Sequence, residues 1–297
     1  MPDLWNDLLA CLDLHRTEPT DDTNGHPSAA DPGATAVFEG PNLRLEYRRL
    51  FGGQILGQFV RATELACPDK TVKSVHATFA KEGRSGETVR YEVSRHHEGR
   101  SFATLTIIAR QSAAVVASAA VSMHSAEAGP ELQSTAEVPA VPTDAQRVEF
   151  SLLPWETRSD ADLNETAAAA PEYEFWMRTP AVGQDLAPAL TAYATDLNLI
   201  GTALRPVEGV SQGGNGTVFD SAVTSHTLWF HRPFRTDDWL LLRQHSPLLA
   251  HGRCFGRGDV LTASGTLVAS YAQEAILRFK PDAAQQLSEV HRVEQKV

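Results

Sequence analysis

The 297-residue chain contains few cysteines, and it lacks both an excess of basic residues and a long apolar run. Its three cysteines, Cys11, Cys67 and Cys254, are odd in number and have no paired metal-ligand spacing, which favours reduced thiols in a cytoplasmic protein. A formal net charge of −11 argues against a nucleic-acid-binding surface, which needs a basic face. This net charge does not exclude an anionic ligand bound by a few local arginines.

The sequence also lacks the usual signals for a membrane or an export pathway. No apolar run approaches the roughly 20 residues that span a bilayer, so stable membrane insertion is not expected. The first residues carry Asp3 and Asp7 without a basic region, which is not typical of a signal peptide.

Two short words occur twice at nearly the same spacing. Gly99-Arg100-Ser101-Phe102 returns as Gly252-Arg253-Cys254-Phe255, and Val116-Ala117-Ser118 returns as Val268-Ala269-Ser270. The offsets are 252−99=153 and 268−116=152, about half the chain length. This spacing predicts one structural unit used twice, and each half is long enough to bury its own core.

The order of predicted elements repeats in the same way. Helices are expected over about 52–66 and 187–204, both apolar nearly all round and therefore buried. Strands are expected over 73–82, 87–97, 100–112 and 114–124, and again near 221–231, 238–247, 250–261 and 266–280. A helix followed by a mostly antiparallel sheet, twice, predicts an α+β duplication in which each sheet wraps its helix.

The remaining segments predict the domain limits. Residues 3–15 are typical of a short amphipathic helix, and 18–36 of a flexible excursion. Residues 125–165 are rich in proline and suit a linker. We therefore expect a first domain over 1–125, a linker over 126–165 and a second domain over 166–297.

Asp196 is the one charged residue on a stripe of the second predicted helix that otherwise reads Ala189, Ala192, Tyr193, Leu199, Ile200 and Ala203. An unpaired buried charge is costly, so this carboxylate either has partners or faces a cavity. The alternative is an aspartate at a frayed or solvated turn.

Gln273 interrupts the apolar face of the last predicted strand. It lies five residues beyond Val268, and the matching position in the first half is Val121, so chemistry that needs an amide there belongs to the second half. A buried carboxylate and a buried amide that converge on one cavity can hold a water, whose proton the carboxylate takes. The alternative is a glutamine satisfied by the backbone.

Segment 221–234 offers hydroxyl groups and two histidines, without a metal-ligand pattern such as His-Glu-x-x-His. Strand alternation puts Val223 and Ser225 on one face, and Thr224 and His226 on the other. From the segment alone, a strand whose polar groups face solvent or bond the backbone is the favoured explanation.

A G-x-S-x-G match occurs around Ser211. A nucleophile elbow needs a helix after the serine, and the glycine-rich residues 213–216 that follow do not favour one. A serine hydrolase acting through Ser211 is therefore disfavoured.

Several of these segments resemble the type II acyl-CoA thioesterases, the TesB-like family of double hotdog proteins. The resemblance rests on Phe51-Gly52-Gly53-Gln54-Ile55-Leu56-Gly57-Gln58 and the first repeated word, on Thr195-Asp196-Leu197-Asn198, on 226–234 and on 267–274. It covers roughly residues 40–124 and 170–280. It implies two fused hotdog domains, hydrolysis of acyl-CoA to free fatty acid and CoA, no cofactor or metal, and a homo-oligomer.

The family's site implies roles for particular residues here. An aspartate on the second helix, a threonine or serine on the next strand and a glutamine on the last strand correspond to Asp196, position 223 and Gln273. Position 223 is valine, which cannot hold a water, so the hydroxyl is expected from Ser225 on the same face or from Thr224 if a β-bulge turns it inward. The alternative function is a non-catalytic acyl-CoA-binding protein that lost this hydroxyl.

Overall fold

The computed structural model describes residues 3–17, 36–45 and 49–281. The predicted flexible excursion over 18–36 lies outside the described residues except for Ala36. The first half contains α1 (Leu4–Leu12), β1 (His15–Thr17), β2 (Ala36–Gly40), α2 (Gly52–Ala66), β3 (Thr71–Phe79), β4 (Val89–Glu98), β5 (Phe102–Gln111) and β6 (Ala114–His124). The second contains β7 (Glu156–Arg158), β8 (Glu172–Arg178), α3 (Ala187–Thr195), α4 (Leu199–Leu204), β9 (Phe219–Phe230), β10 (Leu240–Ala250), β11 (Arg253–Thr262) and β12 (Leu267–Phe279).

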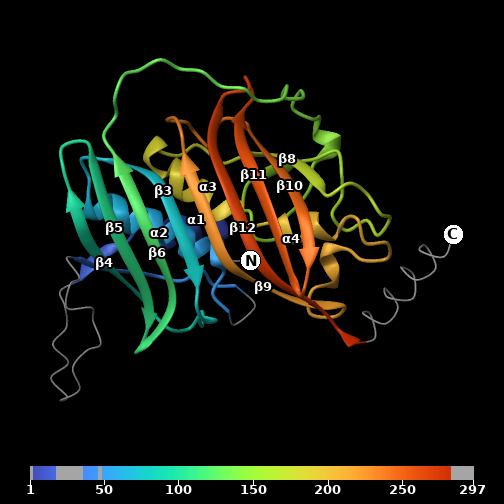
Figure 1. Cartoon of the computed structure of the whole chain (residues 1–297), viewed down its shortest axis with the longest axis horizontal. Coiled ribbons are helices and arrows are strands. Elements are labelled where there is room, and N and C mark those ends of the chain that lie inside the picture. The colour runs from blue at the N-terminus through green and yellow to red at the C-terminus, as the bar shows by residue number, and fades with distance from the viewer. Residues whose placement is uncertain (1–2, 18–35, 46–48, 282–297) are drawn as a thin grey trace.

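The strands of both halves form one continuous antiparallel sheet. In the described part of the chain it has 12 strands in the order β1-β2-β4-β5-β6-β3-β9-β12-β11-β10-β8-β7. The halves join where β3 pairs with β9, and the α-helices lie behind the sheet in the view of Figure 1. This architecture confirms the predicted α+β fold of two hotdog units, each a sheet wrapped around a helix.

The repeated words occupy equivalent places. Gly99 and Gly252 lie in the hairpin turns before β5 and β11, and Val116 and Val268 lie in β6 and β12. Gly252 has φ +72, a left-handed conformation that glycine adopts without strain. The sequence duplication is therefore also a structural one.

The central helices of the two halves pack closely against each other. A Cβ added at Gly53 of α2 would lie 2.4 Å from the backbone oxygen of Tyr193 in α3. Gly57, one turn later, also lies close to the backbone of α3, because its added Cβ would be 3.1 Å from the Ala189 oxygen. The absence of side chains at Gly53 and Gly57 thus allows the first turns of α2 to pack closely along α3.

The structure departs from the predicted elements at several places. The helix predicted over 187–204 is broken into α3 and α4, because Asn198 takes a left-handed conformation with φ 73. The short strands β1, β2, β7 and β8 were not predicted, and β7 lies inside the predicted linker. From β6 the linker arches over the sheet toward β11 and β8 (Figure 1). Within the described residues, no helix has the length and apolar character that crossing a membrane requires.

Candidate active site

A cavity of about 690 Å³ opens where the two halves meet. Its lining from the first half includes the start of α2 and the turn at Lys81, and its lining from the second half includes the α3–α4 break and the start of β9. This volume lies in the range of small-molecule sites. The residues that line this cavity include Asp196, Asn198 and Thr224.

Asp196 caps the C-terminus of α3 and is 8% exposed. Its Oδ2 accepts a hydrogen bond of 2.9 Å from the backbone N–H of Gly53, at the N-terminus of α2, where the helix dipole favours an anion. Its Oδ1 is buried without a partner among the described residues. Burial raises the pKa of Asp196 to about 7, and the Gly53 hydrogen bond offsets only part of that rise. The carboxyl therefore titrates near neutral pH.

Gly52 allows this approach. A Cβ at residue 52 would lie 2.8 Å from Asp196 Oδ2, so any other residue would displace the carboxylate. The sequence motif that contains Gly52 and Gly53 was noted, but its contact with Asp196 was not predicted, because the two segments lie far apart in the chain.

A β-bulge in β9 determines which side chains face the cavity. Val223 pairs with Ala275 and Ser225 with Glu274, so Thr224 is the extra residue between them. The bulge puts Val223 and Thr224 in the cavity wall, and the Thr224 hydroxyl donates to the Glu274 carbonyl over 3.0 Å.

The predicted shared face of Val223 and Ser225 is wrong for the same reason. Ser225 lies opposite Glu274 on one side and opposite the exposed Thr78 on the other, and it is not among the described residues that line the cavity. The bulge reverses the alternation, so Ser225 points to the outer face of the sheet while His226 points inward.

Gln273 is buried in β12, as the alternation predicts. Its Oε1 lies 2.9 Å from His226 Nδ1, and His226 Nε2 lies 3.1 Å from the hydroxyl of Thr195, the residue before Asp196. Burial lowers the pKa of His226 to about 4, so the ring is neutral at physiological pH. Gln273 is not among the described residues that line the cavity; it connects to the α3 terminus through His226.

The equivalent pair in the first half is apolar. Val121 of β6 lies opposite Val75 of β3, just as Gln273 of β12 lies opposite His226 of β9. Both valines are buried. The polar pair is therefore confined to the second half.

Asn198 is a further residue of the site, one that the sequence pattern did not predict. It is 5% exposed and lines the cavity, yet neither Oδ1 nor Nδ2 has a hydrogen-bond partner in the described part of the molecule. Its spacing of two residues from Asp196 was visible in the sequence. Its position was not, because a continuous helix would have put it on another face.

Ser211 has no nucleophile-elbow geometry. It is followed by a short 3₁₀ turn, Gln212–Gly214, rather than by an α-helix. Ser211 is also absent from the described lining of the cavity.

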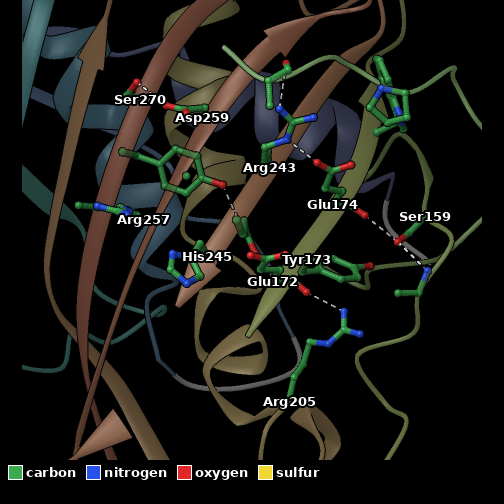
Figure 2. Close-up of a pocket in the computed structure, with 18 of the residues that line it drawn as sticks. Ser159, Glu172, Tyr173, Glu174, Arg205, Arg243, His245, Arg257, Asp259 and Ser270 are labelled. Carbon is green, nitrogen blue, oxygen red and sulfur yellow. Dashed lines mark hydrogen bonds and ion pairs between the residues drawn. The ribbon is translucent and has the colours of Figure 1, made fainter. Parts of the chain in front are cut away.

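A second cavity of about 800 Å³ lies on the outer face of β8, β10, β11 and β12, beneath the linker (Figure 2). Among its charged groups, Arg243 is paired with Glu174, and Asp259 accepts a hydrogen bond from Ser270. None of the predicted site residues is among its described lining residues. The cavity between the two halves is therefore the stronger candidate for the active site.

Comparison with known proteins identifies the family. Residues 45–124 match the model of the acyl-CoA thioesterase N-terminal domain, and residues 121–277 match that of the C-terminal domain. Acyl-CoA thioesterase 2 of Haemophilus influenzae is 29% identical over 304 residues, covering 94% of this chain and 99% of that protein. Human acyl-coenzyme A thioesterase 8 is 27% identical over 282 residues, covering 84% and 86%.

A solved structure agrees with these matches. The acyl-CoA thioesterase II TesB2 of Mycobacterium marinum superposes with a TM-score of 0.69 at 26% identity, covering 92% of this chain and 98% of that one. The C-terminal domain model alone spans more than half of the 297 residues. The chain therefore belongs to the type II acyl-CoA thioesterases, hydrolases that act on thioesters.

Proposed function

We propose that the cavity between the two halves hydrolyses acyl-CoA, with Asp196 as the general base. The observation that carries this proposal is the state of the Asp196 carboxyl: one oxygen is held by the Gly53 N–H, and the other is buried, unpaired and beside the cavity. A base whose pKa is about 7 can accept a proton and return it at physiological pH.

The reaction follows from these groups. Asp196 takes a proton from a water whose oxygen attacks the thioester carbonyl carbon. The tetrahedral intermediate then re-forms the carbonyl and breaks the C–S bond, and the CoA thiolate leaves with the proton held by Asp196. Thiol release from acyl-CoA of different chain lengths tests the function, and the alternative of a non-catalytic acyl-CoA-binding protein requires tight binding without thiol release.

Gln273 is proposed to orient the same water through its amide nitrogen. Because His226 is neutral and Gln273 Oε1 can only accept, Nδ1–H donates to Gln273 Oε1. Its Nε2 then faces the Thr195 hydroxyl at 3.1 Å, a hydroxyl that also lies 3.0 Å from the Ala192 carbonyl. This arrangement fixes the oxygen end of the Gln273 amide, whose Nε2 makes no hydrogen bond with any other described residue. The free N–H₂ group is then the end available to a water.

Thr224 supplies the hydroxyl in this proposal, in place of the valine at position 223. The Thr224 hydroxyl proton is committed to Glu274, so its oxygen is left to accept a hydrogen bond from the water. We expect Thr224→Ala to lower kcat about 3- to 10-fold, the worth of one neutral hydrogen bond, and the matched Ser225→Ala to leave kcat unchanged. Steady-state kinetics of both variants measure this. A larger loss in Ser225→Ala than in Thr224→Ala would assign the hydroxyl to Ser225.

Lys81 is proposed to bind a CoA phosphate at the mouth of the cavity. It is exposed and lines the cavity, and its ammonium has no ion pair among the described residues, whereas nearby Arg49 is paired with Glu82 at 2.8 Å. We expect Lys81→Ala to raise KM for acyl-CoA about 3- to 10-fold, as for one exposed ionic contact, and to leave KM for acyl-pantetheine unchanged. The exposed Lys73, which lies over the Phe102 ring, provides the control variant Lys73→Ala. Equal changes with both substrates would show that Lys81 does not recognise the nucleotide.

The oligomeric state, the compartment, the pathway and the domain division stay predictions. We propose a homo-oligomeric enzyme of cytoplasmic fatty acid metabolism, with the domain division at 1–125, 126–165 and 166–297. Size-exclusion chromatography with light scattering measures the oligomeric state.

A further inference from the structure

Asn198 occupies an unusual place in the backbone. It stands between α3 and α4 at φ 73, in the left-handed region that asparagine adopts more readily than most residues. An asparagine at the N-cap of a helix normally accepts a backbone N–H with its side-chain oxygen, but Asn198 makes no such bond to α4. The side chain is therefore not used to stabilise the start of α4.

Both polar atoms of this side chain are buried and unpaired. Oδ1 and Nδ2 have no partner among the described residues, and the residue is 5% exposed. Burying an amide without hydrogen bonds costs free energy that a small apolar residue would avoid. Asp196, two residues earlier, leaves one carboxylate oxygen unpaired in the same cavity wall. Unsatisfied groups gathered at one cavity indicate that a ligand completes them.

We propose that Asn198 Nδ2–H is the hydrogen-bond donor that stabilises the oxyanion during thioester hydrolysis, an inference that rests on the proposed function of this cavity. When water attacks the carbonyl carbon, the electron pair of the C=O bond moves to its oxygen, and Asn198 holds the resulting negative charge. When the C–S bond breaks, that pair re-forms the carbonyl, and the hydrogen bond weakens again. A donor that acts on developing charge accelerates the reaction without tightening substrate binding.

Two other donors in the same cavity wall are already in use. The Gly53 N–H donates to Asp196, and the Thr224 hydroxyl donates to the Glu274 carbonyl. Asn198 follows Asp196 by two residues and lines the same cavity, so the base can act on the attacking water while the amide binds the carbonyl oxygen of the same thioester. An amide donor is also neutral and does not lower the pKa of Asp196 as a cation would.

The test is Asn198→Gly, which removes the amide while keeping a residue that accepts φ 73. We expect kcat to fall about 100- to 1,000-fold, as for loss of one oxyanion donor. The dissociation constant of an S-alkyl-CoA thioether, which lacks the carbonyl, should stay within about twofold, and the melting temperature should not fall. Ser112→Gly, at an exposed left-handed turn with φ 49, is the matched control and should change neither.

Three results would overturn the proposal. The first is an unchanged kcat. The second is a loss of thioether binding as large as the loss of kcat, which would mean that Asn198 holds the pantetheine arm. The third is a lowered melting temperature, which would mean that Asn198 has a structural role. If Asn198→Gly does not fold, Asn198→Asp, which retains the shape without the N–H donor, should show the same loss of kcat, and full activity in that variant overturns the proposal. Asp196→Asn is measured in parallel: if it is inactive while Asn198→Gly is fully active, only this inference fails, and if it is fully active the proposed function itself fails.

Discussion

Asp196→Asn is expected to lower kcat by at least about 100-fold, the lower range for loss of a general base. Asparagine keeps the shape and can still accept the Gly53 N–H, so the loss reports the chemistry rather than the fold. In the unmodified enzyme kcat/KM should rise with pH through about 7, because only the ionised carboxylate accepts the proton of water. A pH–rate profile checks this, and a profile flat between pH 5 and 9 contradicts a role for Asp196 as base.

The same variant should be more stable than the parent at pH 8. The unfolded chain loses the Asp196 proton near its ordinary pKa of 3.8, whereas the folded chain holds the proton to about pH 7, so parent stability falls as pH rises through this window. The difference corresponds to up to about 4 kcal/mol at pH 8 and should vanish near pH 4. Urea unfolding at both pH values measures it, with Asp220→Asn on the exposed side of β9 as the control. A variant that is less stable than the parent at pH 8 contradicts the burial of an uncompensated carboxylate.

Gln273→Met is expected to produce the second large effect, a fall in kcat of about 100-fold. Methionine has a similar length but cannot donate a hydrogen bond to the water. It also leaves the buried His226 Nδ1–H without its acceptor, which should cost about 1–3 kcal/mol of stability. Kinetics and thermal unfolding separate the two consequences, because the fall in kcat persists in the folded fraction.

Val121→Ala is the matched variant in the first half. Val121 is 2% exposed and occupies the place equivalent to Gln273, so the change should cost about 1–3 kcal/mol of stability and leave kcat per folded molecule unchanged. Equal kinetic damage from Val121→Ala and Gln273→Met would show that both halves take part in the chemistry.

Much of the architecture follows from local pattern in the sequence. The helix from Gly52 to Ala66 and the eight long strands were predicted within a few residues, because each carries its own hydrophobic period and ends at turn residues. Gln273 was predicted to be buried for the same reason, as the one polar residue on an apolar strand face. The strands β1 and β7 have only three residues each, too few to show a period.

The parts of the site that escaped prediction depend on contacts between distant segments. The left-handed Asn198 breaks a helix whose sequence has no glycine or proline at that point. The bulge at Thr224 inverts strand alternation within a single residue, so it exchanges the predicted places of Ser225 and His226. The Gly53–Asp196 hydrogen bond joins residues 143 positions apart, and no periodicity in either segment reveals it.

The dependence of Asp196 on the start of α2 has a consequence for the two halves. The second residue of α2 is Gly53, whose N–H holds the carboxylate, whereas the second residue of α3 is Pro188, which has no N–H to give. A dimer of two second halves would therefore lack this N–H donor. A dimer of two first halves would have Val121 and Val75 in place of Gln273 and His226. The two halves thus contribute different groups to one site, and neither half paired with a second copy of itself would contain the full set.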